Sequence, residues 1–347
     1  MTQSPYLSDK VWVPVRMKDI ALDLGVSLMT VSKALRNHSD ISQQTRDRVL
    51  KRMRELNYQP DWIARSMVTR RTYLVGLVLP DLMHSFFAEV AKGVARKLTP
   101  LGYHAVILNT EEDGETERRH VEILLTRKVD GLIIASAQRS GQLDLFETLK
   151  RREVPYVLID RVINGVEANF VGTKDEDLGV MATTHLIDQG CKRVAHIRGP
   201  QNGTGTARLK GYKRALTKRG MAIRPSHIVS GQYGDNTGYE AMRELLKIDP
   251  LPDGVFCYND PVAAGAVKAV LEAGLRVPED IAIIGAGNVH YSDLLRVPLS
   301  TIDQSSAAIG ESAAELLCEC MEAKKPGEMK KIFIPSRLVV RESSQRL

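Results

Sequence analysis

A short segment near the N-terminus places apolar and cationic side chains where a helix could contact the edges of DNA bases. Leu28, Met29 and Lys33 fall on one side of a predicted helix, opposite the apolar Val31 and Ala34. In the major groove, a lysine can donate to guanine O6 and N7, and apolar side chains can touch the thymine methyl group. The start of a recognition helix reaches these base edges. We therefore expect Leu28, Met29 and Lys33 to contact bases.

Hydroxyl and guanidinium groups around the same segment suit the DNA backbone instead. Thr30 and Ser32 can donate hydrogen bonds to phosphate oxygens, and Arg16 and Arg46 can bind phosphates through their positive charge. Such contacts fix the position of a protein on the duplex without reading its sequence. We assign these four residues to phosphate contacts.

A helix-turn-helix is the element that would hold these side chains. Ile20, Ala21 and Leu24 fall on one face of a short helix, and Gly25 breaks this pattern. Glycine adopts the positive φ that a tight turn between crossing helices often needs. Ser27 is suited to cap the helix that follows the turn.

The charge of the chain is concentrated in the same region. Residues 10–72 contain thirteen Lys or Arg and six Asp or Glu, a net charge of +7. Residues 1–9 carry −1 through Asp9 and residues 73–347 sum to zero, so the whole chain carries +6. A cationic excess confined to one end favours binding to a polyanion there. A third helix, predicted over 43–56 and capped by Ser42, would complete a three-helix core for this basic region.

With these motifs, the chain resembles the LacI/GalR family of transcription regulators over roughly residues 16–343. The resemblance rests on V-S-x-x-T-V-S at 26–32, on L-x-Y-x-P at 56–60 and on A-R-S-M at 64–67, where the family has A-R-x-L. It implies a sequence-specific repressor whose affinity for operator DNA is controlled by a small-molecule effector, a sugar or sugar derivative.

The resemblance also implies a hinge that contacts DNA after the third helix. Met67 matches a leucine that the family inserts into the minor groove, and Ala64 belongs to the same DNA-contacting segment. Such an apolar wedge unstacks a base step and bends the duplex. Asp61 stands where the family often has Asn. Trp62 replaces a smaller residue, and it either packs the hinge against the dimer mate or is simply buried in the hinge.

Beyond the hinge, short β-rich runs alternate with helical patterns. The alternation predicts parallel sheets with helices on both faces, and the strands are too many for one compact sheet. We expect two Rossmann-like lobes, the architecture of periplasmic sugar-binding proteins. The predicted strands are 74–79, 105–108, 131–135, 156–159, 194–197, 254–257 and 281–285, and the predicted helices are 87–98, 117–127, 178–189, 207–219, 239–247 and 262–273.

These patterns divide the chain into four parts. They are an N-terminal extension at 1–15, an all-α helix-turn-helix domain at 16–60, a hinge at 61–72 and an effector-binding and dimerisation domain at 73–343. Within the last part, lobe 1 is expected at about 73–173 and 305–331, and lobe 2 at about 174–303 and 333–343.

Several residues at predicted strand ends match effector-pocket positions of the family. Ligands of open α/β sheets sit beyond the carboxyl ends of the strands, so two facing lobes form a cleft there. Lobe packing is the alternative role for Phe86 and Phe87, and a structural ion pair is the alternative role for Arg208. The resemblance implies the effector-binding residues Asp81, Phe86, Phe87, Asp160, Arg208, Tyr233, Asn259 and Gln304.

The sequence departs from the family at one pocket position. Many members carry an acidic residue after I-G-[YF], where this chain has Gly287 in Ile284-Gly285-Ala286-Gly287. The pocket therefore lacks one carboxylate, and Asp160, Asp81 or His290 is expected to compensate. This difference leaves the effector, and whether it releases or promotes DNA binding, open.

The same glycines offer a second interpretation, a dinucleotide fingerprint. G-x-G-x-x-G requires a third glycine where His290 stands, and no helix pattern follows, so the dehydrogenase interpretation fails. The sequence shows no other enzyme motif and predicts no cofactor and no metal site, because the histidines and the four cysteines lack ligand spacing.

A periplasmic-type solute-binding protein without DNA function is the remaining alternative. The first ten residues do not resemble a signal peptide, and no apolar run approaches the length of a membrane span. We expect a cytoplasmic protein without membrane contact. Because a two-fold operator needs two reading heads and no leucine heptads follow residue 341, we expect a homodimer on a pseudo-palindromic operator.

Overall fold

The computed structural model divides the chain into two compact units, Met1–Thr72 and Tyr73–Leu347. Ala64, Met67 and Tyr233 lie outside the residues it describes, as do Asp61 and Trp62. The described residues are 15–35, 38–58, 66, 69, 71–138, 141–201, 203–231, 236–323 and 327–346.

The small unit holds three helices around one apolar core. They are α1 (Met17–Leu24), α2 (Leu28–Leu35) and α3 (Gln43–Glu55). Each helix contributes a pair of buried side chains to the core, which comprises Ile20, Ala21, Val31, Ala34, Val49 and Met53. The predicted helix-turn-helix and its third helix are therefore present, with α3 ending one residue earlier than expected.

The predicted caps and turn of the small unit are also present. The backbone N–H of Thr30 donates to Ser27 Oγ at 3.0 Å, and that of Thr45 donates to Ser42 Oγ at 3.2 Å. Each hydroxyl satisfies an amide that the first turn of a helix leaves without a partner. Gly25 ends α1 with φ of 65°, a conformation that a side chain would penalise.

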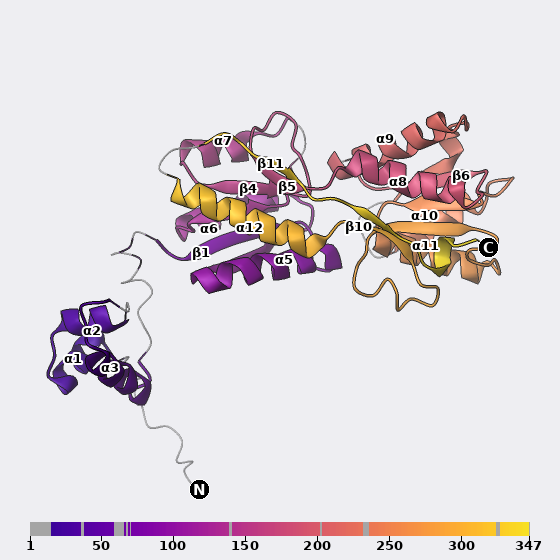
Figure 1. Cartoon of the computed structure of the whole chain (residues 1–347). Helices are drawn as coiled ribbons and strands as arrows, with labels where there is room; N and C mark the ends of the chain where they lie inside the picture. The colour runs from indigo at the N-terminus through magenta and orange to yellow at the C-terminus, as the bar shows by residue number, and fades with distance from the viewer. Residues whose placement is uncertain are drawn as a thin grey trace, which may run out of the picture. The chain divides into compact units, whose positions relative to one another are not determined.

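The first sheet of the large unit is parallel and has helices on both faces (Figure 1). Helices α5 (Ser85–Leu98) and α12 (Ser306–Glu322) lie side by side on one face, and α6 (Gly114–Thr126) and α7 (Asp144–Arg151) cover the other. The strand order is β11 (Lys331–Phe333), β5 (Asn169–Gly172), β4 (Tyr156–Ile159), β3 (Gly131–Ile134), β1 (Leu74–Leu79) and β2 (His104–Asn109).

The second sheet repeats this plan, except that its edge strand β12 (Arg337–Val339) pairs antiparallel with β10 (Ser300–Asp303). Helices α8 (Asp175–Asp188) and α9 (Gly203–Lys218) pack on one face, and α10 (Thr237–Leu245) and α11 (Asp260–Glu272) on the other. The strand order is β12 (Arg337–Val339), β10 (Ser300–Asp303), β9 (Ala282–Gly287), β8 (Gly254–Cys257), β6 (Val194–Arg198) and β7 (Ile228–Ser230).

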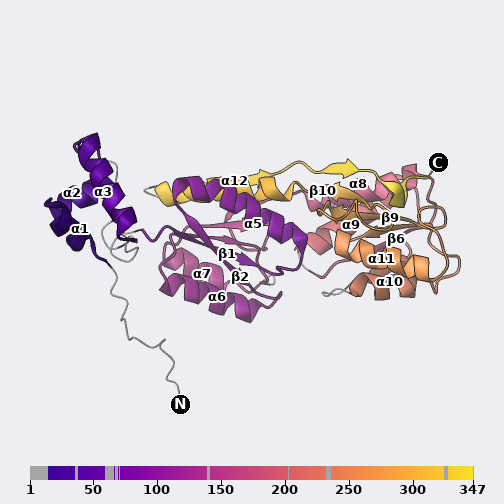
Figure 2. The same cartoon turned by 90° about the horizontal axis from the view of Figure 1, so that it is seen from below.

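Two lobes follow from three crossings of the chain between the sheets, after β5, after β10 and after β11 (Figure 2). The observed lobes differ from the expected ones near the C-terminus. Phe333, expected in lobe 2, belongs to lobe 1, because it pairs with Gly172 in β5, and Ser344, beyond the expected end of lobe 2 at 343, is buried with lobe 2. Within the described residues, no helix has the length and apolarity needed to cross a bilayer.

Close helix contact in lobe 1 generates the first prediction. A Cβ on Gly310 of α12 would lie 2.1 Å from the carbonyl oxygen of Val90 in α5. Alanine normally stabilises a helix relative to glycine, but this clash forces α5 and α12 apart, and overpacking typically costs about 1–3 kcal/mol. We expect Gly310→Ala to lower the urea midpoint of unfolding measured by circular dichroism. Gly327→Ala, with open space around it, is the control, and a raised midpoint for Gly310→Ala would contradict the packing.

Candidate functional site

A cavity of about 150 Å³ lies between the two lobes, beyond the carboxyl ends of their strands. We call it the inner chamber. It brings together residues that are far apart in the sequence and that come from both lobes. Its lining includes every described residue of the predicted effector set: Asp81, Phe86, Phe87, Asp160, Arg208, Asn259 and Gln304.

The two phenylalanines belong both to the inner chamber and to the core of lobe 1. Phe86 and Phe87 are only 3% and 4% exposed, and their ring centroids lie 5.1 Å apart in an edge-to-face arrangement. The preceding His84 caps α5, because its Nδ1 accepts from the backbone N–H of Phe86 at 3.2 Å. This cap starts α5 at Ser85, two residues before the predicted start. Lobe packing and cavity lining are therefore joint roles of these rings.

Arg208 forms the ion pair that the sequence left as an alternative. Its Nε donates to Asp175 Oδ1 at 2.8 Å, and its Nη1 donates to the backbone oxygen of Tyr258 at 2.7 Å. Both charged side chains are buried. Burial raises the pKa of Asp175 to about 6, against the lowering effect of the Arg208 guanidinium. Removing either partner would leave a buried charge without its counter-ion.

A polar contact between the lobes closes one side of the inner chamber. His84 Nε2, from lobe 1, lies 3.0 Å from Asn259 Nδ2, from lobe 2; in the tautomer whose Nδ1 caps α5, Nε2 carries the proton, so this is a close approach of two donor groups and not a hydrogen bond. Asn259 also caps α11 by accepting from the backbone N–H of Val262 at 3.0 Å. Burial lowers the pKa of His84, while the carboxylates of Asp160 and Asp81 oppose this effect. His84 was missed because a histidine in a loop carries no signal until its partner is known.

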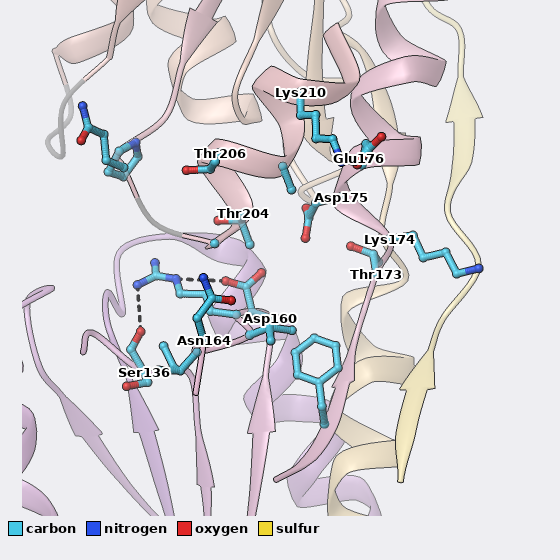
Figure 3. A pocket seen from close by; sticks show the side chains of 18 of the residues that line it. Ser136, Asp160, Asn164, Thr173, Lys174, Asp175, Glu176, Thr204, Thr206 and Lys210 are labelled. Carbon is cyan, nitrogen blue, oxygen red and sulfur yellow. Dashed lines mark hydrogen bonds and ion pairs between the residues drawn. The ribbon is translucent and has the colours of Figure 1, made fainter. Parts of the chain in front are cut away.

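Asp160 ends β4 in a left-handed conformation with φ of 63°. Aspartate tolerates this region better than most residues, and the turn directs its carboxylate into the cleft (Figure 3). The adjacent Arg161 is buried and binds Glu112, with its Nη1 2.6 Å from Glu112 Oε2. Sequence reasoning missed Arg161 and Glu112, although Arg161 directly follows a predicted strand end. The pair holds the β4 end against the loop after β2.

The departure at Gly287 has a local explanation. Gly287 has φ of 136°, where a side chain would be strained, and a Cβ there would lie 3.6 Å from Asp260 Oδ2. Asp260 is buried and accepts from Val289 N at 3.0 Å and from Ser292 Oγ at 2.9 Å. Of the three proposed compensating residues, Asp81 and Asp160 line the inner chamber. His290 is exposed and is not among the lining residues, so that part of the expectation is wrong.

The residue run around Gly287 also lacks the structure of a dinucleotide site. After β9 the chain forms turns rather than a helix. Gln304, at the crossing that follows β10, instead donates from Nε2 to Thr173 Oγ1 at 3.2 Å, next to the crossing that follows β5. This bond ties two crossings together beside the inner chamber.

A second cavity, of about 950 Å³, adjoins the inner chamber and also lies between the lobes. We call it the outer chamber. Asp160 and Asn164 approach it from lobe 1, and Thr204 and Asp175 from lobe 2 (Figure 3). No predicted effector residue other than Asp160 lines this chamber within the described part of the chain. Among the described residues there is no cluster of side chains suited to hold a metal ion.

In the small unit, α2 exposes the predicted reading surface. Leu28 and Met29 are adjacent on α2, and their side chains are 51% and 60% exposed. Lys33 is ion-paired with Asp40. Arg46 is half-buried, and its Nη2 donates to the backbone oxygen of His38 at 2.8 Å. Its role in the unbound protein is to fix the segment between α2 and α3.

The remaining predicted phosphate contacts lie at helix starts or on α2. Arg16 is exposed immediately before α1, and its backbone N–H donates to Asp19 Oδ2 at 2.7 Å. Thr30 and Ser32 are half-buried on α2. The hydroxyl of Thr30 lies 2.8 Å from that of Ser27.

A helix-turn-helix unit joined to a two-lobed unit with a cleft defines the ligand-responsive DNA-binding regulators. Residues 16–61 match the model described as bacterial regulatory proteins, lacI family, and residues 183–344 match a periplasmic binding protein-like domain. The chain belongs to the LacI family of bacterial transcription regulators, in which its relatives act as repressors.

Two curated relatives are similar over almost their whole length. The ribose operon repressor of Halalkalibacterium halodurans is 33% identical over 330 residues, covering 95% of this chain and 97% of the relative. The HTH-type transcriptional repressor PurR of Haemophilus influenzae (strain PittEE) is 34% identical over 331 residues, covering 94% and 98%.

Solved structures give the same result. The Lac repressor dimer bound to operator and the anti-inducer ONPF superimposes with a TM-score of 0.85 at 26% identity, covering 96% of this chain and 99% of that one. The transcriptional regulator CelR in complex with cellobiose gives 0.72 at 29% identity, covering 95% and 99%.

The buried pair of Arg208 and Asp175 generates the second prediction. Arg208→Ala leaves Asp175 as an uncompensated buried charge, which costs about 3–5 kcal/mol of unfolding free energy. Replacing both partners with apolar residues, Arg208→Met with Asp175→Leu, should recover most of this loss, because no buried charge remains. Urea unfolding followed by circular dichroism measures both effects. A cost below about 1 kcal/mol for Arg208→Ala would show that the pair is not coupled.

Proposed function

We propose that this chain is a repressor whose affinity for operator DNA is controlled by a carbohydrate bound between its lobes. The observation that carries the proposal is the convergence of the seven predicted residues on one chamber, alongside an exposed reading helix. Both features occur in one chain. A solute-binding protein without DNA function would need the chamber but not the reading helix. We infer regulation by binding rather than enzyme catalysis, and a cytoplasmic site of action.

For the DNA-binding unit, we propose that Lys33 donates to guanine and that Leu28 and Met29 contact thymine methyl groups. Thr30 and Ser32, with the exposed Arg16, are proposed to bind phosphates. The ion pair with Asp40 holds Lys33 in the unbound protein, so DNA has to displace that carboxylate. We also propose that Arg46 binds a phosphate, in addition to its hydrogen bond to the backbone oxygen of His38.

The hinge contacts remain proposals about residues outside the described part of the chain. Met67 is proposed to wedge into a central operator step, with Ala64 beside it in the minor groove. A homodimer would place two wedges and two reading helices on a pseudo-palindromic operator. The Lac repressor, to which this chain is similar, is a dimer bound to operator in its solved structure.

For the effector, we propose a polyhydroxylated ligand in the inner chamber. Phe86 and Phe87 offer aromatic surface, while Asp160, Asn259 and Gln304 offer hydrogen-bonding groups of fixed position. Relatives named for the ribose operon and bound to cellobiose favour the same ligand class.

Coupling between effector and operator then follows from the lobes. A ligand that contacts both lobes binds tightly in one lobe arrangement only. It shifts the equilibrium between lobe arrangements by the difference between its affinities for them, and by no more. We expect a coupling of about 1–3 kcal/mol, and the operator must change effector affinity by the same factor.

Base reading by Lys33 is the third prediction. Lys33→Ala should weaken binding to the best operator selected from random DNA by about 1–3 kcal/mol and flatten the preference at one base pair per half-site. Lys51→Ala, an exposed cation on α3, should instead weaken all sequences similarly. Fluorescence anisotropy at one fixed salt concentration measures both variants. An equal loss on every sequence for Lys33→Ala would refute its role as a reader.

Effector binding by Asp160 is the fourth prediction, and it tests the proposed function. Asp160→Asn removes a charged acceptor while keeping a side chain that tolerates φ of 63°. We expect the effector concentration that gives half of the change in operator binding to rise by about tenfold or more. The affinity for operator without ligand should stay unchanged. Anisotropy titrations with ligands from a thermal-shift screen provide the measurement. An undiminished response would remove Asp160 from the site.

A further inference from the structure

The inner and outer chambers adjoin each other and share part of their lining. Both are lined by Glu112, Asp160, Arg161 and Pro200. Side chains of the two chambers also bond directly across their shared wall. Arg208 of the inner chamber binds Asp175 of the outer one, and the hydroxyl of Thr204 in the outer chamber lies 3.1 Å from that of Tyr258 in the inner one.

The sizes of the two chambers restrict what can fill them. A cavity of about 150 Å³ holds a single six-membered ring such as benzene. The inner chamber, at about 150 Å³, therefore accepts one sugar ring at most. The outer chamber, at about 950 Å³, is at the upper end of the range of ligand clefts, about 300–1,000 Å³. A monosaccharide in the inner chamber would leave most of the space in the two chambers filled with water.

The outer chamber repeats the chemistry of the inner one. Phe333 is 42% exposed at its edge, and its ring centroid lies 5.8 Å from that of Phe170, so an aromatic surface is available. Asn164, Thr204 and Thr206 supply an amide and hydroxyls around the same space (Figure 3). An aromatic surface with a few oriented polar groups is what a second sugar ring requires.

The charges around the outer chamber do not favour an anionic ligand. Lys210 binds Glu176 with Nζ 2.8 Å from Oε2, and Arg214 binds both Glu176 and Asp177. The buried guanidinium of Arg161 is likewise held by Glu112. The Lys210, Arg214 and Arg161 cations are neutralised by these partners. Lys174, which also lines the chamber, has its Nζ 5.8 Å from the centroid of the Phe333 ring, a cation–π contact. A phosphate would have to break one of these pairs.

We propose that the effector is a neutral glycoside of at least two sugar units. One ring occupies the inner chamber, beside Phe86 and Asp160, and the next unit occupies the outer chamber, beside Phe333 and Thr206. The inference rests on the proposed carbohydrate-controlled repressor, and it adds the length and the charge of the ligand.

The test compares ligand lengths in the full-length protein. A thermal-shift panel pairs monosaccharides with neutral disaccharides and trisaccharides built from them, using glucose, galactose, mannose and xylose in α and β linkages. Glucose 6-phosphate, ribose and guanine are included as charged, shorter and non-carbohydrate probes. Calorimetry then gives the affinity of each stabilising compound, and operator anisotropy gives its effect on DNA binding. We expect a disaccharide or trisaccharide to bind at least about tenfold more tightly than its monosaccharide.

Two variants localise the second unit. Thr206→Trp fills part of the outer chamber from an exposed position on α9, and Lys213→Trp places the same ring at an exposed position of α9 that does not line the chamber. We expect Thr206→Trp to weaken the longer ligand by about tenfold and Lys213→Trp to leave it within about twofold. Equal effects of the two variants would overturn the assignment of the outer chamber.

The outcomes separate this proposal from the proposed function. A monosaccharide that binds as tightly as its longer relatives and changes operator affinity overturns the two-unit ligand but supports the carbohydrate-controlled repressor. Glucose 6-phosphate or guanine as the tightest ligand overturns the neutral glycoside and leaves only ligand control. A panel in which no compound binds overturns the glycoside as effector.

Discussion

Two buried arginines shape the cleft, because a guanidinium removed from water needs a carboxylate and hydrogen-bond acceptors around it. Arg208 is held by Asp175 and by the backbone oxygen of Tyr258, and this arrangement joins the starts of α8 and α9 to the end of β8. Arg161 is held by Glu112 and also donates to the backbone oxygen of Ser136 at 3.3 Å. Each pair fixes the strand ends of one lobe.

The pairing also decides what the cleft can recognise. Since the buried cations are neutralised within the protein, the groups left to orient a ligand are hydroxyls, amides, aromatic rings, the carboxylate of Asp81 and the part of the Asp160 carboxylate that is not engaged by Arg161, whose Nε lies 3.3 Å from Asp160 Oδ2. Carboxylates accept hydrogen bonds from hydroxyl groups and repel phosphates. The loss of the family's acid at Gly287 fits the same balance, because an additional acid there would stand beside the buried Asp260.

The sequence allowed the placement of the site because strand ends in parallel sheets converge. Asp81, Asp160 and Asn259 each follow a buried apolar run, so their meeting between two lobes was predictable from alternation alone. The contact partners of the cleft residues could not be predicted, since no local pattern indicates that Arg161 binds Glu112 or that His84 faces Asn259. Strands β5 and β10 were missed because polar residues interrupt them, with the sequences NFVG and STID, whereas the equally short β4 and β8 are nearly continuous apolar runs.

The arrangement of the crossings bears on how a bound ligand would influence the rest of the chain. The segments after β5 and β10 are tied by the bond between Gln304 and Thr173, while His84 and Asn259 meet at another side of the inner chamber. The first contact lies where the chain itself passes between the lobes, so the covalent connection keeps its two residues near each other. His84 and Asn259 come from different lobes and lie away from the crossings, so a change in lobe arrangement would alter the distance between their side chains more directly.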